Sequence, residues 1–433
     1  MRLTKGDGRG YTVFLDRLGI YPPLAWGFAG LLLFMVGDGV ESGYLSPYLV
    51  EQGFDEQAVA WIFTAYGLTA AAAAWLSGAL SDLWGPYRVM GAGLGFWTVF
   101  EVAFLLLGIA PKNYPLILLF YTLRGFGYPL FAFGFLVWVT AATPPPRMGT
   151  AVGWFWFAFT GGLPTLGSLF ASYAVPWVGP YVTLWLSLLL VLAGGLIALG
   201  GVREPTGRRR LAPPQEKPIA TLLSSVTIAW KEPKIAIGCL VRTINTAPEF
   251  GFLVFLPIYF TQTIGFELRQ WLRLLSLIFL SNIIWNLLFG VIGDRFGWRW
   301  TVALCGGLGS ALSTLLLYYV PHCFGANFSF AALAGILYGA TLAGYVPLSA
   351  LMPSLTPENK GAALSMLNLG AGASVWGGPA LVALLLPRVG VAGVMWLFAA
   401  LYLVSAILTL FLTHPAEDTQ QKVARVQLIA EEP

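Results

Sequence analysis

The sequence contains one pattern twice: Gly78-Ala-Leu-Ser-Asp82-Leu-Trp-Gly85-Pro-Tyr-Arg88 and, about 212 residues later, Gly290-Val-Ile-Gly-Asp294-Arg295-Phe-Gly297-Trp-Arg299. Each copy has a glycine, an aspartate four residues on, a second glycine three residues beyond it, and then an arginine. Each copy also follows a long apolar run. A repeat of this kind predicts a chain built from two related halves.

The composition places most of the chain in lipid. Charged residues make up 10% and hydrophobic residues 57% of the 433 residues, whereas a soluble domain carries about 25% charged residues. At roughly 20 apolar residues per span, twelve membrane helices and their loops fill the chain. We expect them at 24–50, 57–80, 88–110, 115–141, 148–173, 180–202, 235–263, 271–293, 300–320, 327–353, 359–386 and 389–413.

The polar segments divide the chain into five parts. We expect a cytoplasmic N-terminal segment (1–23), a first six-helix bundle (24–202), a cytoplasmic linker (203–234), a second bundle (235–413) and a cytoplasmic tail (414–433). Residues 219–230 of the linker could form an amphipathic helix on the membrane surface. We expect the first segment to be retained, because it has neither a short apolar region nor a clear cleavage site.

Positive charge predicts the orientation of these parts. With the N-terminus inside, inner segments hold 18 of the 24 Lys and Arg residues, outer loops hold four, and two lie within spans. Positive charge favours the cytoplasmic side. We therefore expect both termini to be cytoplasmic, in a multi-pass protein of the bacterial inner membrane. The net charge of +4 is better explained by loop placement than by nucleic-acid binding, and we expect no nucleic-acid partner.

The repeated pattern resembles the signature G-x-x-x-D-[RK]-x-G-x-[RK] of the major facilitator superfamily, and the resemblance covers essentially the whole chain. The first copy departs from it by Leu83 and by an arginine one place late. The resemblance implies an all-α membrane protein with twelve transmembrane helices in two pseudo-symmetric six-helix bundles. It also implies a solute site near the midplane, lined by the first, fourth, seventh and tenth spans, with the third span peripheral.

We expect the two copies to act as gates. An aspartate can face the positive N-terminus of a helix, the glycines allow a tight turn, and arginines can pair with the aspartate or with lipid. Such a latch can break as the halves rock. The expected gating residues are Gly78, Asp82, Gly85, Arg88, Gly290, Asp294, Arg295, Gly297 and Arg299.

Six ionisable residues fall within spans, where each needs a partner, water or a function. They are Asp38, Glu41, Glu101, Arg124, Arg242 and Glu249. Asp38 and Glu41 stand three apart, so we expect them to share a helix face. The expected proton-coupling residues are Asp38, Glu41, Arg124 and Glu249. For Glu101, a structural role and proton transfer both remain open.

Charged and polar stripes in the two halves predict a solute site between them. Arg124 and Tyr128 share a stripe of the fourth span, and Arg242, Asn245 and Glu249 share one of the seventh. A purely structural pair is the alternative, with Arg124 bound to the acids of the first span and Arg242 partly satisfied by Glu249. Further amides and aromatics suit a polyhydroxylated solute; they are Asn282, Asn286, Tyr338, Tyr345, Asn368 and Trp376.

The run Phe34-Met35-Val36-Gly37-Asp38-Gly39-Val40-Glu41, continuing to Leu45-Ser46-Pro47-Tyr48-Leu49, closely resembles the ribitol and D-arabinitol permeases. This resemblance implies import of a pentitol or similar polyol in symport with a proton. The partners we expect are the polyol, protons and the lipid bilayer around a monomer. We expect no cofactor and no bound metal.

Three other transport functions and an enzyme are the alternatives. A dicarboxylate symporter for a 2-oxoglutarate-like anion would use Arg124 and Arg242. The spans contain four acids and only these two bases, however, and this balance disfavours an anion unless several acids are protonated. A sugar symporter is a further alternative. A drug exporter is less favoured, because Thr160-Gly-Gly-Leu-Pro164 does not match the G-P-x-x-G-G element of such antiporters. The sequence contains no metal cluster, Ser-His pair or phosphate loop that would indicate an enzyme.

Overall fold

The computed structural model describes residues 20–144, 147–212, 232–356 and 360–413. Within these ranges the chain is helical and contains no β-strand. The expected N-terminal segment lies almost entirely outside them, and the amphipathic helix at 219–230 and the tail at 414–433 lie wholly outside them.

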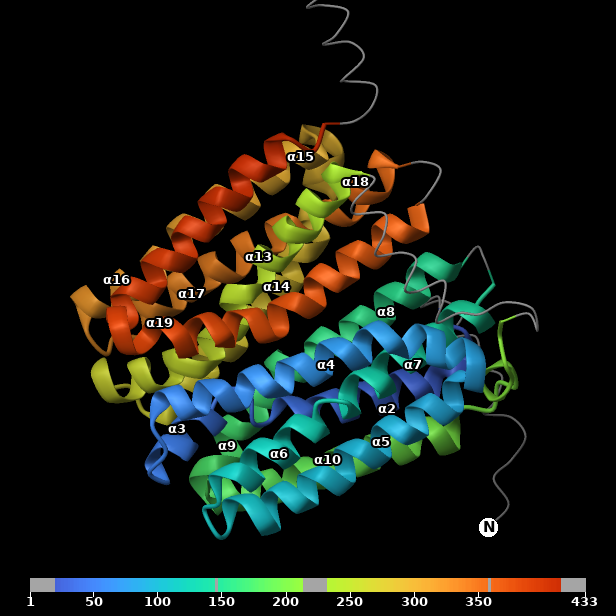
Figure 1. Cartoon of the computed structure of the whole chain (residues 1–433), viewed down its shortest axis with the longest axis horizontal. Coiled ribbons are helices and arrows are strands. Elements are labelled where there is room, and N and C mark those ends of the chain that lie inside the picture. Colours follow the sequence, from blue (N-terminus) through green and yellow to red (C-terminus); the bar gives the residue numbers. More distant parts are fainter. Residues whose placement is uncertain (1–19, 145–146, 213–231, 357–359, 414–433) are drawn as a thin grey trace, which may run out of the picture.

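Helices of the first part of the chain lie together in the lower half of Figure 1. Several of them are interrupted, between α2 and α3, between α6 and α7, and at the short π-helical segments η2 and η4. The elements are η1 (Pro22–Leu24), α2 (Ala25–Gly39), α3 (Leu45–Glu51), α4 (Glu56–Trp84), α5 (Pro86–Ala103), η2 (Phe104–Ile109), α6 (Tyr114–Arg124), α7 (Gly127–Ala142), α8 (Met148–Thr160), η4 (Gly161–Leu166), α9 (Gly167–Val178), α10 (Pro180–Gly201) and η5 (Thr206–Arg208).

The second part of the chain forms the upper group in Figure 1. Its last helix, α19, is interrupted at Gly390, whose φ of 65° and ψ of −177° are not helical. The elements are α13 (Pro233–Ile258), η6 (Tyr259–Thr263), α14 (Leu268–Phe296), α15 (Trp298–Thr301), η7 (Val302–Leu308), α16 (Gly309–Phe324), α17 (Phe328–Leu342), η8 (Ala343–Tyr345), α18 (Leu348–Leu355) and α19 (Lys360–Leu410).

Nine helices of the described ranges are long and apolar enough to cross a membrane. The longest of these, Ala363–Leu410, contains the break at Gly390. The expected spans at 24–50 and 148–173 correspond to the interrupted helices α2–α3 and α8–η4–α9. The all-α membrane fold is thus confirmed, while the count of twelve spans stays a prediction.

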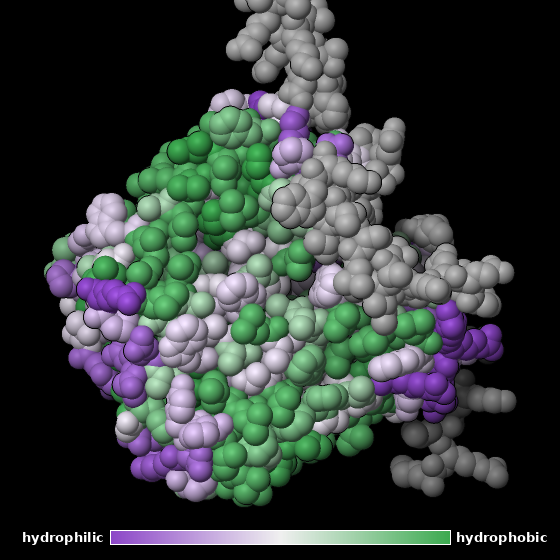
Figure 2. Space-filling view, in the orientation of Figure 1, coloured by the Kyte–Doolittle hydropathy of each residue, from purple (hydrophilic) through white to green (hydrophobic). Residues whose placement is uncertain are grey.

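Helix caps gather at one end of the molecule, and the surface between the ends is apolar. Asp55 caps α4 and Asn113 caps α6 by accepting backbone N–H groups, as Asn327 does for α17. Such caps satisfy donors that a helix start leaves unpaired. Figure 2 shows hydrophobic side chains over the middle of one face and hydrophilic residues at its two ends. This distribution matches the hydrocarbon core of a bilayer and its two polar surfaces.

Hydrogen bonds join the two groups of helices near α3. The indole of Trp271 donates to the carbonyl of Gly43 at 2.8 Å, the hydroxyl of Ser46 donates to the carbonyl of Val254, and the amide of Gln57 donates to the carbonyl of Ala383 at 3.0 Å. In Figure 1 the two groups converge toward the end that contains α3 and spread apart toward the end that contains α15 and α18. We call the end near α3 the closed end.

Glycines let helices approach more closely than side chains would allow. In α2, a Cβ at Gly30 would lie 2.5 Å from the carbonyl oxygen of Gly194, and a Cβ at Gly39 would lie 1.6 Å from that of Leu163. Real Cβ atoms do not come this close to backbone. The sequence of α2 therefore sets its distance from α10 and η4, and with it the position of the acids at the end of α2.

The substitution Gly39→Ala tests this packing. Its methyl group would force α2 and η4 apart, so we expect the free energy of unfolding to fall by about 1–3 kcal/mol. Thermal unfolding of the purified protein in detergent measures the change. Gly95→Ala is the matched control, because a Cβ there meets nothing within 4 Å and alanine favours a helix by about 1 kcal/mol. Equal melting temperatures for the two variants would contradict the close approach.

Candidate functional site

The first span is interrupted where its two acids lie. Helix α2 ends at Gly39 and α3 begins at Leu45. Between them the backbone makes tight turns, with the N–H of Ser42 bonded to the carbonyl of Gly39 and the N–H of Tyr44 bonded to that of Glu41. Asp38 therefore lies on the last turn of α2 and Glu41 in the break. The two acids do not share a regular helix face, and each takes a different partner.

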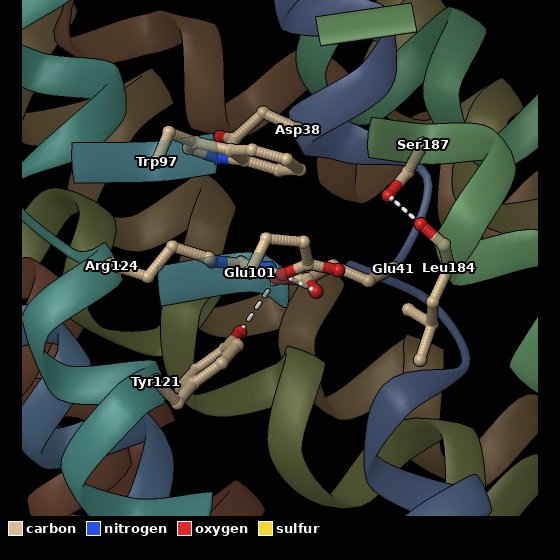
Figure 3. A network of polar contacts seen from close by, with 8 residues as sticks. All are labelled: Asp38, Glu41, Trp97, Glu101, Tyr121, Arg124, Leu184 and Ser187. Atoms are coloured by element: carbon tan, nitrogen blue, oxygen red, sulfur yellow. Dashed lines mark hydrogen bonds and ion pairs between the residues drawn. The ribbon is translucent and has the colours of Figure 1, made fainter. Parts of the chain in front are cut away.

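Arg124, the last residue of α6, is the centre of the site (Figure 3). Its side chain has no exposed surface, and its guanidinium holds both carboxylate oxygens of Glu41, with 2.8 Å between Nη1 and Oε2. Nη1 also donates to Oε2 of Glu101. A planar guanidinium suits such forked pairing with carboxylates. The side chain of Arg124, in the fourth span, thus contacts acids of both the first and the third span.

Aromatic rings surround this guanidinium. Its central carbon lies 4.6 Å from the ring centre of Tyr121, 4.9 Å from that of Trp97 and 5.5 Å from that of Tyr66. These distances are within cation–π range, and such contacts strengthen when water is excluded. The rings therefore stabilise a cation that is otherwise costly to bury.

Two of the rings also bind the acids. Trp97 donates its indole N–H to Oδ1 of Asp38 at 2.5 Å, and Tyr121 donates its hydroxyl to Oε1 of Glu41 at 2.8 Å. Asp38 and Glu41 are each only 4% exposed. These contacts unite six residues in one buried cluster, which we call the acid cluster. Its members are Asp38, Glu41, Trp97, Glu101, Tyr121 and Arg124.

Sequence reasoning missed Trp97 and Tyr121, and the third span contributes more than its expected peripheral position suggested. The spacing of Trp97 and Glu101, four residues apart, and of Tyr121 and Arg124, three apart, puts each pair on one helix face. This spacing was the available signal. A glutamate and a tryptophan on one face of a membrane helix indicate an inward orientation.

The fourth span breaks immediately after Arg124. Gly125 and Phe126 separate α6 from α7, and a Cβ at Gly125 would lie 2.2 Å from Oγ1 of Thr69. A Cβ at Gly127 would lie 2.5 Å from Cβ of Trp97. The Gly-Phe-Gly sequence thus brings Arg124 against α4 and α5 at the level where the first span is also interrupted. Tyr128 lies one residue into α7, buried and with its ring centre 6.4 Å from that of Tyr66.

The charges of the second half do not form a corresponding cluster. Arg242 donates to Oδ1 of Asn245, and the structure shows no ion pair between Arg242 and Glu249. The backbone carbonyl of Asn245 accepts the hydroxyl of Tyr402 at 3.1 Å. Glu249 lines a narrow, mostly apolar crevice with Tyr338, among other residues. Arg242 and Glu249 interact electrostatically without a direct ion pair, so the expected partial satisfaction of one by the other stays a prediction.

The remaining expected binding residues make contacts mostly within the second half. Asn282 donates to the carbonyl of Gly339 at 3.2 Å, and Asn286 donates to Oδ1 of Asn282 at 3.2 Å. The hydroxyl of Tyr345 donates to that of Ser405 at 2.9 Å, and that of Tyr338 shares a bond of 3.1 Å with Tyr402. Asn368 and Trp376 are exposed. None of these residues contacts the acid cluster.

The repeated pattern lies in two equivalent turns. Gly85 and Gly297 have φ of 85° and 88°, a conformation that glycine adopts without strain. Gly78 and Gly290, in contrast, lie inside α4 and α14, not in turns, and a Cβ at either would meet nothing within 4 Å. The expectation that all four glycines form tight turns is thus wrong for the first glycine of each copy.

The charged residues of the pattern lie at these turns. Asp294 accepts the indole N–H of Trp298, the first residue of α15, at 2.8 Å. The carbonyl of Asp82 accepts the backbone N–H groups of Leu211 and Ala212, so the start of the expected linker binds the first turn. Of the arginines, Arg88 and Arg295 are exposed and Arg299 is partly buried.

Comparison with known proteins supports the fold and the family. The model of the family described as Major Facilitator Superfamily matches residues 27–288 and 239–430. The chain is 45% identical to "Alpha-ketoglutarate permease" of Bacillus subtilis (strain 168), over 94% of this chain and 92% of that protein. It is 38% identical to "D-arabinitol transporter" of Klebsiella pneumoniae, over 95% and 97% of the two chains.

A solved structure shows the same fold. The crystal structure of D-xylose-proton symporter superposes with a TM-score of 0.67 at 17% identity and covers 90% of this chain and 96% of that chain. At this identity the likeness concerns the arrangement of helices alone.

Removing the central cation should destabilise the protein strongly. Arg124→Gln leaves Glu41 and Glu101 buried without their ion-pair partner, so we expect the free energy of unfolding to fall by about 3–5 kcal/mol. Thermal unfolding in detergent measures the loss. Arg242→Gln is the matched control, since Arg242 bonds to a neutral amide. An equal loss in both variants would show that the loss does not come from the ion pairs of Arg124.

Proposed function

Because the chain belongs to the Major Facilitator Superfamily, we propose that it imports a pentitol such as ribitol or D-arabinitol by proton symport. At the coarser level it is a multi-pass membrane transporter and not an enzyme. The observation that carries the proton part of this proposal is the acid cluster, where Arg124 faces three buried carboxyl groups.

The charge balance of the cluster requires protons. Asp38, Glu41 and Glu101 carry three negative charges when ionised, and Arg124 carries one positive charge. Buried net charge is costly in a membrane protein. Proton binding removes that charge. Protonation of the cluster is therefore linked to the conformational change that moves the solute across the membrane. Asp38 is the coupling acid we favour, with Arg124 compensating charge after proton release; Glu41 is already held by Arg124 and Tyr121.

The polar surroundings favour a neutral solute over an anion. Arg124 is committed to Glu41 and Glu101, and Arg242 bonds to Asn245. A carboxylate could therefore bind Arg124 only by displacing its acids, and it would have the remaining donors of Arg242 alone. Hydroxyl groups can instead bond to carboxylates and amides, while aromatic rings take the C–H edges of a polyol. The similarity to the D-arabinitol transporter supports the same substrate class.

Import proceeds by alternating access in this proposal. We propose two halves, 24–202 and 235–413, joined by a cytoplasmic linker, with both termini on the cytoplasmic side of the inner membrane. The closed end, with Trp271 bound to Gly43, is then the outer end, and the described arrangement faces inward. Rocking of the halves would break these bonds and rearrange the turns at Gly85 and Gly297. A monomer is sufficient for this cycle.

One proton per solute is enough to concentrate it. Moving one charge across 100 mV is worth about 2.3 kcal/mol, which corresponds to roughly fifty-fold accumulation. The proposal therefore requires no further energy source.

Uptake by proteoliposomes tests the substrate and the coupling together. We expect ribitol or D-arabinitol to accumulate when a pH gradient, acidic outside, and an inside-negative potential are imposed, because each proton entering with the polyol runs down both. The panel also contains xylitol and 2-oxoglutarate. Concentrative polyol uptake that survives collapse of both gradients would refute proton symport.

Transport of 2-oxoglutarate is the second candidate function, favoured by the 45% identity to the Bacillus subtilis permease. A dianion would need the guanidinium of Arg124 to leave Glu101 or Glu41. In the same panel, accumulation of 2-oxoglutarate with no accumulation of pentitols would replace the polyol by this anion.

The substitution Asp38→Asn tests the coupling acid. The amide keeps a hydrogen-bond acceptor for Trp97 but cannot ionise, so we expect concentrative uptake to fall to the equilibrium level while exchange of labelled for unlabelled polyol persists. Glu51→Gln, at an exposed carboxylate at the end of α3, should leave both activities unchanged. Unchanged accumulation in Asp38→Asn would remove Asp38 from the mechanism.

A further inference from the structure

Glu101 has a carboxyl oxygen without a partner in the centre of the protein. Its side chain has no exposed surface, Oε2 accepts a bond from Arg124, and Oε1 is buried with no hydrogen-bond partner. A buried polar atom left unpaired costs free energy, and the cost is larger when the group is charged. The environment of Oε1 thus opposes a negative charge on this residue.

The other two acids of the cluster have either more donors or some contact with solvent. Glu41 accepts bonds from both terminal nitrogens of Arg124 and from the hydroxyl of Tyr121. Asp38 accepts the indole N–H of Trp97 and retains a small exposed fraction. Glu101 shares a single guanidinium nitrogen with Glu41 and has no contact with solvent. Hydrogen bonds to an ionised carboxylate stabilise that form. Glu101 and Asp38 each accept one, but only Glu101 has a buried carboxyl oxygen with neither a hydrogen-bond partner nor solvent.

We propose that Glu101 is a positioning residue that carries a proton on Oε1 and, in this neutral form, leaves the charge of Arg124 to Glu41. The proton comes from water and forms the O–H bond of a carboxylic acid, while Oε2 continues to accept from Nη1 of Arg124. Loss of that proton returns it to water and makes Glu101 a second anion that competes with Glu41 for the guanidinium. No other bond changes.

The consequence of a neutral Glu101 for transport rests on the proposed function. With Glu101 neutral, Arg124 balances Glu41, and Asp38 is the one uncompensated charge of the cluster. A single proton on Asp38 then makes the cluster neutral, which gives one proton per transport cycle. With Glu101 ionised, one proton would leave a net charge buried, and movement of the halves would carry that charge through the membrane.

Groups on every neighbouring element bear on this proton. The chain segment 38–44 presents Asp38, Glu41 and Tyr44, and α6 presents Tyr121 and Arg124. Around the guanidinium, α4 adds Tyr66 and α5 itself adds Trp97, while α7 carries Tyr128 near Asp38. The hydroxyl of Ser187 on α10 donates instead to the carbonyl of Leu184 in its own helix (Figure 3). Arg124 is the one cation among these groups.

The test is the pH profile of exchange in proteoliposomes, using labelled D-arabinitol and equal pH on both sides. The wild type should lose exchange at alkaline pH, as Glu101 ionises. Glu101→Gln, which mimics the neutral acid, should remain active there and still reach the roughly fifty-fold accumulation that one proton supports at 100 mV. The same comparison in an Asp38→Asn background removes the titration of Asp38. Glu101→Asp is the conservative control and should keep an alkaline loss.

Two outcomes of this test would overturn the proposal. An unchanged alkaline loss in Glu101→Gln would show that another group causes it, and a folded Glu101→Gln protein without exchange at any pH would show that the ionised form is required. If Glu101→Gln does not fold, infrared difference spectra of the wild type and Glu101→Asp decide. A protonated carboxyl band that is lost on alkalisation and altered in Glu101→Asp supports the proposal, and absence of such a band overturns it.

The proposed function and this inference fail in different ways. If the wild type shows no gradient-driven uptake of D-arabinitol, proton symport of a polyol is wrong. The infrared band of Glu101 requires neither substrate nor gradient, and it still decides whether the residue is neutral.

Discussion

The arrangement of the first half depends on one buried guanidinium. A cation without solvent must be balanced by charge, by hydrogen bonds and by polarisable neighbours. Glu41 supplies balancing charge to Arg124, and Glu41 and Glu101, from different spans, accept its hydrogen bonds. Tyr121 and Trp97 are the polarisable neighbours. The first, third and fourth spans thereby meet at a single side chain, and displacement of any of them removes a hydrogen-bond partner from a buried group.

Breaks in the helices let side chains of several spans reach Arg124. The break between α2 and α3 places Glu41 outside a regular turn, and the break after Arg124 turns α6 into α7. Glycines accompany both breaks, because a β-carbon at Gly39 or Gly125 would collide with a neighbouring helix. Irregular backbone within a membrane is tolerated only where protein or a water-filled cavity surrounds it. The breaks and the charges are thus features of one polar region.

The repeated pattern has different surroundings in the two halves of the chain. Gly85 and Gly297 adopt the same left-handed conformation at equivalent turns. The first turn is covered by residues 207–212, with Arg209 and Gly207 against Gly85, whereas Gly297 has no atom near its missing β-carbon. The polar cores also differ: the first half contains ion pairs, while Arg242 in the second half bonds to an amide. The repeat therefore specifies the backbone, and the side chains have diverged.

The sequence by itself determined the membrane class, the approximate positions of the helices and the family. These follow from apolar run length, from charge that lipid excludes and from a twice-repeated pattern, all of which are local properties of the chain. It also picked out the six Asp, Glu and Arg residues within the spans, because such groups are rare and costly in a membrane.

Only the tertiary structure decided which of those residues meet. Glu101 joins Arg124 and Glu41, while Arg242 and Glu249 form no direct ion pair, although their spacing along the helix favoured the second pairing. The physical reason is that partners on different helices depend on the distance and rotation between those helices. Glycine contacts and helix breaks set both, and their effect appears only when the helices are packed together.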